Sequence, residues 1–166
     1  MKAKKLTLMA VLSAIALTIF IAEAQIPPIV PVPGMKLGLA NIVTLLVMAY
    51  LGRKEAGIVL LVRILMGSVF AGSVSALIFS LAGGILAYLA MALLIGLFSD
   101  RLLWVVSIFG AIAHNAGQLA AAVFVTKTAG LLYYAPALLA AAIITGVFTG
   151  VAAMYLLRAI QKLNLK

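Results

Sequence analysis

Residues 6–34 of the chain read LTLMAVLSAIALTIFIAEAQIPPIVPVPG, and this stretch decides what kind of fold the sequence can adopt. Its first part, residues 6–25, is apolar and matches the roughly 20 residues that a helix needs to cross the hydrocarbon of a bilayer. Its second part, residues 26–34, holds four of the five prolines in the protein. Proline removes a backbone donor and fixes φ, so we predict an extended, non-helical segment there.

The start of the chain also resembles a secretory signal peptide. Lys2, Lys4 and Lys5 precede the apolar run, and Ala22-Glu-Ala24 imitates a small-residue cleavage site. The apolar run is longer than a usual signal core, and a chain that is apolar throughout needs its first span. We therefore expect this segment to be retained as a transmembrane helix.

The composition extends this interpretation to the whole chain. Of 166 residues, 67% are hydrophobic and 9% are charged, and the mean hydropathy is +1.33. Soluble domains are closer to half apolar and about a quarter charged. The length suits a single domain, residues 1–166, embedded in the lipid bilayer. The net charge of +9 comes from 12 dispersed basic residues without a dense patch, which argues against nucleic-acid binding.

Five more apolar segments follow the first. They cover residues 37–51, 55–70, 73–98, 102–126 and 136–157. The sequence thus predicts an all-α integral membrane bundle of six transmembrane helices. The second and third segments are short for a full crossing. The pairs Gly83-Gly84 and Gly146/Gly150 predict close contacts between helices inside the bundle.

The basic residues set the orientation. If the helices alternate and the N-terminus is inside, nine of the 12 basic residues lie on the inner side, as the positive-inside rule requires. Both termini are then cytoplasmic, in a multi-pass protein of the cell membrane. The three exceptions are Lys36, Arg63 and Lys127, which fall in the outer half.

Ionisable groups within a membrane are costly unless they are paired or wet, so these exceptions are candidates for function. Structural alternatives remain for each of them. Arg63 could pair with Glu23, the one acidic residue of the outer half, and Lys36 and Lys127 could extend to the lipid headgroups.

A second polar group lies midway along the fifth segment, in the sequence His114-Asn-Ala-Gly-Gln118. His114, Asn115 and Gln118 are three or four residues apart, so they share a helix face that must point into the bundle. They either bind a ligand or form hydrogen bonds between helices. A single His without neighbouring Cys, His or acidic residues is a poor metal site, so we predict no metal and no cofactor.

Four motifs together resemble a known family. They are the block from Pro31 to Leu45 (PVPGMKLGLANIVTL), Arg63 with Gly67, residues 80–84 (SLAGG) and residues 114–119 (HNAGQL). The chain is identified by them as a member of the Gx transporter family, often labelled heptaprenyl diphosphate synthase component I. That family is similar to the substrate-binding S components of energy-coupling factor (ECF) transporters.

The resemblance implies a function and partners. S components are six-helix proteins that bind a vitamin or similar nutrient from outside and associate with a transmembrane coupling protein and two ATPases. Their first helix contacts the coupling protein through an Ala-xxx-Ala pair, which Ala10 and Ala14 match. The resemblance and the residues agree on a binding region for a small, anionic and partly hydrophobic ligand. Its expected residues are Lys36, Asn41, Arg63, His114, Asn115 and Gln118.

Two other hypotheses stay open. The chain could be a non-catalytic membrane subunit associated with prenyl diphosphate synthesis; its single Asp, Asp100, excludes the Asp-rich clusters that hold magnesium and diphosphate. It could also be another small membrane protein, such as a channel or an assembly factor. In every case we expect no enzymatic activity in this chain, and any use of ATP must come from partners, because no Walker motif is present.

Overall fold

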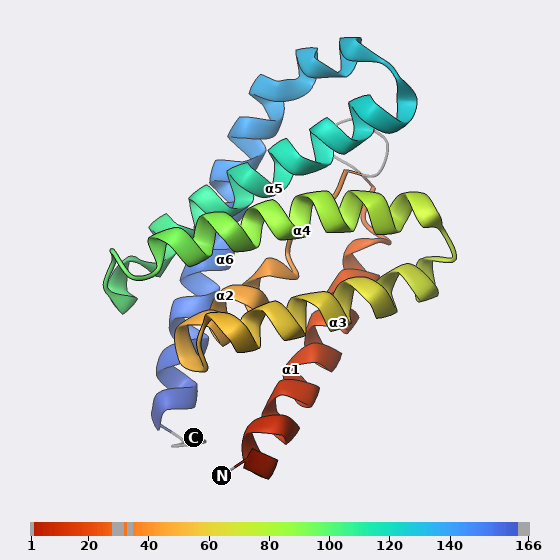
Figure 1. Ribbon diagram of the computed structural model, residues 1–166. Coiled ribbons are helices and arrows are strands. Elements are labelled where there is room, and N and C mark those ends of the chain that lie inside the picture. The colour runs from red at the N-terminus through yellow and green to blue at the C-terminus, as the bar shows by residue number, and fades with distance from the viewer. Residues whose placement is uncertain (1, 28–31, 33–34, 163–166) are drawn as a thin grey trace.

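The computed structural model describes residues 2–27, 32 and 35–162. Within them the chain is helical and contains no strand. Six α-helices and two short 3₁₀ helices follow one another (Figure 1): α1 Lys2–Glu23, α2 Asn41–Tyr50, α3 Arg53–Ala71, α4 Val74–Leu94, η1 Asp100–Leu102, α5 Leu103–Thr126, η2 Ala129–Tyr134 and α6 Ala135–Lys162. The all-α prediction and the six helices are confirmed.

Several helix boundaries differ from the prediction, and three of the differences have a local cause. α2 begins at Asn41 rather than at residue 37, because Gly38 has a φ of +77°, which a helix cannot contain. α4 ends at Leu94 rather than at residue 98, shortly before Gly96, a poor helix former. α6 continues past residue 157 to Lys162, since the polar residues there favour helix and need no lipid.

The predicted extended loop falls largely on residues 28–31 and 33–34, which lie outside the described residues. The described residues beside them, Ile26, Pro27 and Val32, are not helical.

Four stretches of helix are long and apolar enough to cross a membrane: Ala3–Glu23, Val74–Leu94, Asp100–Thr126 and Ala129–Lys162. α2 has 10 residues, and α3 carries Arg53, Lys54, Glu55 and Arg63 among its 19. The prediction of a multi-pass membrane protein is therefore supported by four helices, whereas the prediction of six crossings is not confirmed.

The helices alternate in direction, which brings distant parts of the sequence to the same end of the bundle (Figure 1). Near the two chain ends, Lys5 of α1 forms an ion pair with Glu55 of α3. Gln161 of α6 donates to Asp100 of η1 at 3.5 Å. We call this end, with the starts of α1, α3 and α5, the terminal half of the bundle, and the end with the α3–α4 and α5–α6 links the distal half.

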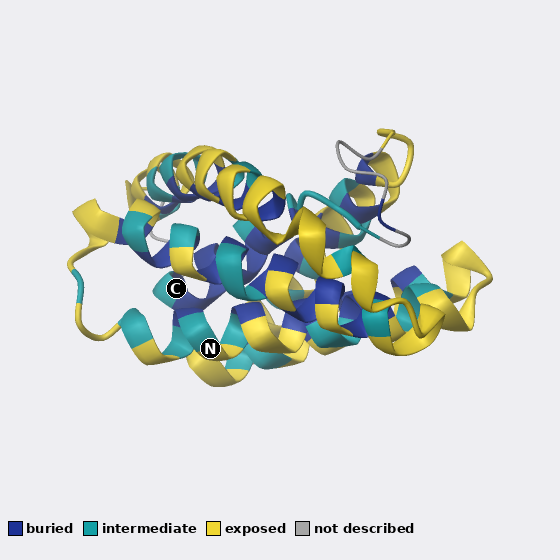
Figure 2. Ribbon diagram, turned by 90° about the horizontal axis from the view of Figure 1, so that it is seen from above, coloured by how far each residue is buried: buried dark blue, intermediate teal, exposed yellow. Residues whose placement is uncertain are grey.

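An apolar core fills the terminal half. α2 is buried over most of its length, and Leu45 and Val47 are fully inaccessible. They pack with residues of the five other helices, such as Leu12, Met91 and Leu157. In Figure 2 the buried segments lie along the inside of the bundle and the exposed ones on its outer surfaces.

Large apolar side chains also cover the outside. Phe124 is 80% exposed and Ile144 is 71% exposed, far more than an aqueous surface favours for such residues. A bilayer supplies the apolar surroundings that these side chains need.

Glycines set the closest helix contacts, as predicted. A Cβ atom on Gly146 would come within 2.6 Å of the Ile108 Cα, and one on Gly150 within 2.4 Å of the Trp104 Cα. α5 and α6 therefore touch backbone to backbone. Gly83 makes a similar approach of α4 to α5 possible, because a Cβ there would meet the Gln118 and His114 side chains at 2.8–2.9 Å.

Candidate functional site

Two cations meet at one aromatic ring in the distal half. The Nζ atom of Lys36 lies 3.4 Å from the centroid of the Phe20 ring, and the Cζ atom of Arg63 lies 5.8 Å from the same centroid. Phe20 comes from the last turns of α1, Arg63 from the middle of α3 and Lys36 from the loop before α2. Both contacts are close enough for a cation–π interaction. Phe20 can approach because Gly67 of α3 has no side chain in its way.

Glu23, one turn beyond Phe20, is buried beside the two cations. Its carboxylate accepts a hydrogen bond from the backbone N–H of Gly38 at 2.5 Å. The backbone N–H of Leu39 also points at the carboxylate as a hydrogen-bond donor. Among the described residues it forms no direct ion pair with Arg63. The structure therefore does not show Glu23 as the direct partner of Arg63; the carboxylate holds the loop before α2 against α1.

The same loop brings α2 and α5 together. The ideal Cβ position at Gly38 is 3.0 Å from the Asn41 amide nitrogen and 3.0 Å from the His114 ring. The backbone N–H of Lys36 donates to the Gln118 side-chain oxygen at 3.1 Å. Asn41, His114 and Gln118 are thus gathered around residues 36–38.

We call Glu23, Lys36, Asn41, Arg63, His114 and Gln118 the polar cluster. Its members come from α1, the loop before α2, α2, α3 and α5. All except Lys36, which is half-buried, are buried.

Several buried polar atoms of the cluster have no hydrogen-bond partner in the described part of the chain. They are the Nε and Nη2 atoms of Arg63, both ring nitrogens of His114 and the Oδ1 atom of Asn41. The backbone of Gly83 lies near enough to act electrostatically on the His114 ring. Native proteins rarely leave such atoms unsatisfied, and each one costs about 1–3 kcal/mol. A ligand that accepts hydrogen bonds would satisfy the Arg63 donors.

The charges of the cluster do not balance. Lys36 and Arg63 are basic, and Glu23 is the one acidic side chain among them. Burial lowers the pKa of Lys36 below its ordinary value of 10.5; the Glu23 carboxylate opposes this shift, and the Arg63 guanidinium adds to it. Two basic side chains thus lie beside one carboxylate, and an anion could supply the missing negative charge.

Three predicted residues lie apart from the cluster. Asn115 donates from its side-chain amide to the backbone carbonyl of Leu138 at 3.0 Å, a bond between α5 and α6 that fits the structural alternative. Its Oδ1 atom has no partner among the described residues. Ala10 and Ala14 are exposed on α1, as a contact with a partner requires.

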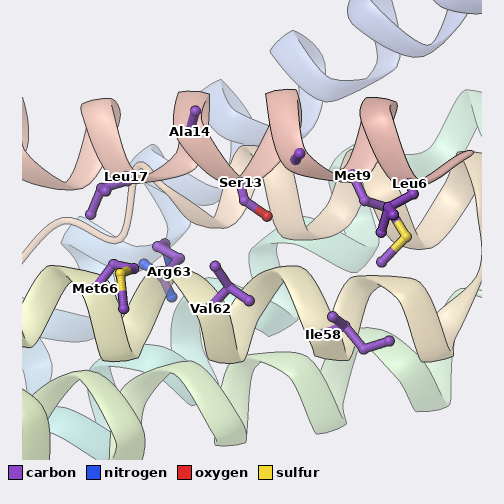
Figure 3. Close-up of a pocket in the computed structure, with 10 residues that line it drawn as sticks. Leu6, Met9, Ser13, Ala14, Leu17, Ile58, Val62, Arg63 and Met66 are labelled. Atoms are coloured by element: carbon purple, nitrogen blue, oxygen red, sulfur yellow. The ribbon is translucent and has the colours of Figure 1, made fainter. Parts of the chain in front are cut away.

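A groove of about 400 Å³ runs between α1 and α3 (Figure 3). From α1 it is lined by residues between Leu6 and Leu17, and from α3 by residues between Ile58 and Met66. Its lining is apolar except for Ser13 and Arg63. The groove therefore leads from the membrane-facing surface to the guanidinium of the polar cluster.

Some parts of this site were not predicted from the sequence. Phe20 lies in an apolar run where nothing distinguishes it, although its position one turn before Glu23 is a signal in hindsight. Gly67 and Gly38 matter because of what approaches them, which depends on tertiary structure. The described residues hold no group of three or more His, Cys, Asp and Glu side chains suited to a metal ion.

The fold and the cluster together define a class: a small helical membrane protein with a buried polar cluster of excess positive charge in one half. The chain matches the family described as heptaprenyl diphosphate synthase component I over residues 12–156, and it belongs to that family. The match covers all members of the polar cluster. No curated protein and no solved structure matches the chain.

Proposed function

We propose that this protein is the membrane-embedded substrate-binding component of an ECF-type nutrient transporter, and that the polar cluster binds a small anionic ligand. One observation carries the proposal: Arg63 is 3% exposed, yet its Nε and Nη2 donors have no partner in the described residues. A guanidinium binds carboxylate or phosphate through two parallel hydrogen bonds, so an anion completes the site. Asn41, His114 and Gln118 would orient the ligand, which the protein binds without changing it chemically.

The decisive experiment is to identify a small molecule that stays with the protein. The chain is purified in mild detergent, and the bound fraction is extracted and analysed by mass spectrometry, with an Arg63→Gln variant treated in parallel. We expect an anionic compound that accompanies the native protein and is depleted in the variant. Equal amounts of every compound in both samples would contradict the anion site.

The proposal requires six crossings of the cell membrane with both termini in the cytoplasm. The placement of nine of 12 basic residues on one side supports this orientation, as does the alternating direction of the helices. Cysteines introduced at Lys4 and Lys166 should be shielded from an impermeant thiol reagent in intact cells. Labelling of both from outside would reverse the orientation.

Transport also requires partners, which we propose are a transmembrane coupling protein and ATPase subunits. Ala10 and Ala14 offer a small-residue surface on which a partner helix can approach closely. Replacing both with Leu should reduce co-purification of the coupling protein. Ala140, which is also exposed but lies on α6, provides the control: Ala140→Leu should keep the partner. Equal loss of the partner in both variants would remove α1 as the docking surface.

The family description favours a second function, a non-catalytic membrane subunit associated with prenyl diphosphate synthesis. The two functions differ in their partners. Isolation of a tagged chain from its own cells should recover ATPase subunits in the first case and a soluble prenyl synthase in the second.

A further inference from the structure

We infer that the ligand of the polar cluster is a single-chain anionic amphiphile, whose head binds at Arg63 and whose tail lies in the groove between α1 and α3. This inference rests on the proposed anion site and adds the substrate class and the route of entry. It starts from the groove, whose lining includes Arg63 of the polar cluster as well as Ala10 and Ala14 of α1.

The groove is closed at both ends. On the distal side the Phe20 ring packs on Gly67, so closely that a Cβ there would lie 2.7 Å from the ring. On the terminal side the ion pair between Lys5 and Glu55 joins the two helices. Between these contacts α1 and α3 separate enough to leave about 400 Å³ (Figure 3). The groove therefore opens sideways between the two helices, toward the lipid.

The side walls suit a hydrocarbon chain. Leu6, Met9 and Leu17 line the groove from α1, and Val62 and Met66 line it from α3. The groove follows α1 over residues 6–17, which is roughly 16 Å at the rise of an α-helix. Methionine side chains adapt to chains of different shape. The volume belongs to the size range of pockets for one small ligand, so a single chain fits better than the two chains of a phospholipid.

Arg63 places a cation beside this apolar groove, where the anionic head of a ligand can bind. Its side chain lines the groove and lies between α1 and α3 in Figure 3. Its Nη2 atom reaches toward α4, 3.4 Å from the ideal Cβ position at Gly84, where Gly leaves room. Nη2 and Nε are buried without partners among the described residues. A phosphate or carboxylate at these donors would also lie near Lys36, which shares the Phe20 ring with Arg63.

Two other cavities of similar size fit this role less well. The pocket of about 440 Å³ between α5 and α6 has Asn115 as its polar member and no cation. The pocket of about 360 Å³ beside Lys36 is bordered by the hydroxyls of Ser73, Ser75, Ser80 and Thr126, a lining that suits a hydrocarbon tail less than the groove does. The first of them supplies a matched control for the experiment.

The test uses the full chain in lipid nanodiscs and dodecyl phosphate with a photoreactive group at the end of its chain. Labelled residues are mapped by mass spectrometry. We expect labels on residues 6–17 and 58–66. Ser13→Phe fills the groove and should reduce labelling about tenfold or more, whereas Leu139→Phe, in the α5–α6 pocket, should not. Unchanged labelling in Ser13→Phe, or labels elsewhere in the chain, would overturn the inference.

Competition by a short anion without a tail distinguishes failure of this inference from failure of the proposed function. Methyl phosphate should compete with the probe in the native protein but not in Arg63→Gln, and it should still bind Ser13→Phe. If methyl phosphate binds in an Arg63-dependent way while the tail labels no groove residue, the anion site stands and the groove inference fails. If neither compound depends on Arg63, the anion site fails as well.

Two further measurements test whether a bilayer lipid or a partner helix occupies the groove instead. Dioleoyl phosphatidate, with two chains, should not displace the probe; displacement would make the groove a site for bilayer lipid. Ser13→Phe should also keep any coupling protein that co-purifies. Loss of that partner together with unchanged labelling would make the groove a helix-docking surface instead.

Discussion

Buried hydroxyls in the terminal half have hydrogen-bond partners, whereas several buried nitrogens in the distal half have none among the described residues. Ser107 and Thr149 face each other between α5 and α6 with their oxygens 2.8 Å apart, and Thr149 also reaches the carbonyl of Thr145 at 2.8 Å. Arg63 and His114, which are just as deeply buried, keep nitrogens without partners in the described residues. The first arrangement holds helices together, and the second is where the proposed ligand would bind. The predictions below test this difference, starting with the largest effect.

The terminal half should not tolerate added volume between α5 and α6. In Gly150→Ala the new Cβ would lie 2.4 Å from the Trp104 Cα, and a backbone atom cannot turn aside as a side chain can. We expect a loss of about 3 kcal/mol or more in the free energy of unfolding, at the upper end of overpacking effects. Thermal unfolding in detergent measures it.

Gly130→Ala is the control for this prediction, because a Cβ at Gly130 would meet nothing closer than the Thr128 side chain at 4.0 Å. The two variants add the same methyl group. Equal melting temperatures for both would show that α5 and α6 are not in backbone contact.

In the distal half, the main effect should fall on binding rather than on stability. Arg63→Lys keeps the charge but cannot form two parallel hydrogen bonds to an anion. We expect affinity to fall by about ten- to a hundredfold, or roughly 1.5–3 kcal/mol, while the melting temperature of the ligand-free protein changes little. Titration of the identified ligand, followed by thermal unfolding, separates the two quantities.

Arg63→Met sharpens the same prediction. It removes a buried charge without a direct partner and keeps an unbranched apolar stem, so the ligand-free protein should become more stable by about 1 kcal/mol. A less stable Arg63→Met protein would show that Arg63 supports the fold through Glu23 after all.

Most residues of the cluster could be selected from the sequence because a charge inside an apolar run is conspicuous. Lys36, Arg63 and His114 stand out against 67% hydrophobic residues, and helical spacing placed His114 and Gln118 on one side of α5. The close approach of Gly146 and Gly150 to α5 was also predictable, since small residues four apart form a continuous groove.

Other features depend on tertiary structure that a single sequence does not contain. Spacing put Asn115 with Gln118, yet the Asn115 side-chain amide donates to α6 while Gln118 binds the Lys36 backbone. The sequence left open whether Glu23 pairs with Arg63; in the structure, backbone N–H groups of the following loop reach the carboxylate instead. The start of α2 was misplaced because Gly38 has a positive φ and lies against His114 and Asn41, neither of which the local sequence reveals.

Lys36 should make binding depend on pH. An anion favours the ammonium form, so affinity is complete below the pKa of Lys36 and is lost as the pH rises through it. Burial lowers that pKa, so the loss should set in below 10.5, the ordinary value. Because Lys36 is half-buried, we expect a change of about 1 kcal/mol, roughly fivefold, in titrations at increasing pH. Lys36→Arg stays charged and should abolish the change; the same decline in that variant would assign it to another group.

The smallest effect should come from the satisfied pair in the terminal half. Because Thr149 already directs its hydroxyl at the Thr145 carbonyl, Ser107 is the donor between the two side chains. Ser107→Ala removes that donor and leaves Thr149 its backbone acceptors, so no polar atom of Thr149 loses its last partner. Hydrogen bonds between helices in membrane proteins contribute about 0.6 kcal/mol on average, and we expect a loss of that size in thermal unfolding. Ligand affinity should not change, since the contacts that hold the polar cluster, including that of Gln118 of α5, do not involve this pair. A Ser107→Ala protein that keeps its stability but binds the ligand more weakly would show that the two halves are coupled through α5, and the division between a supporting half and a binding half would no longer hold.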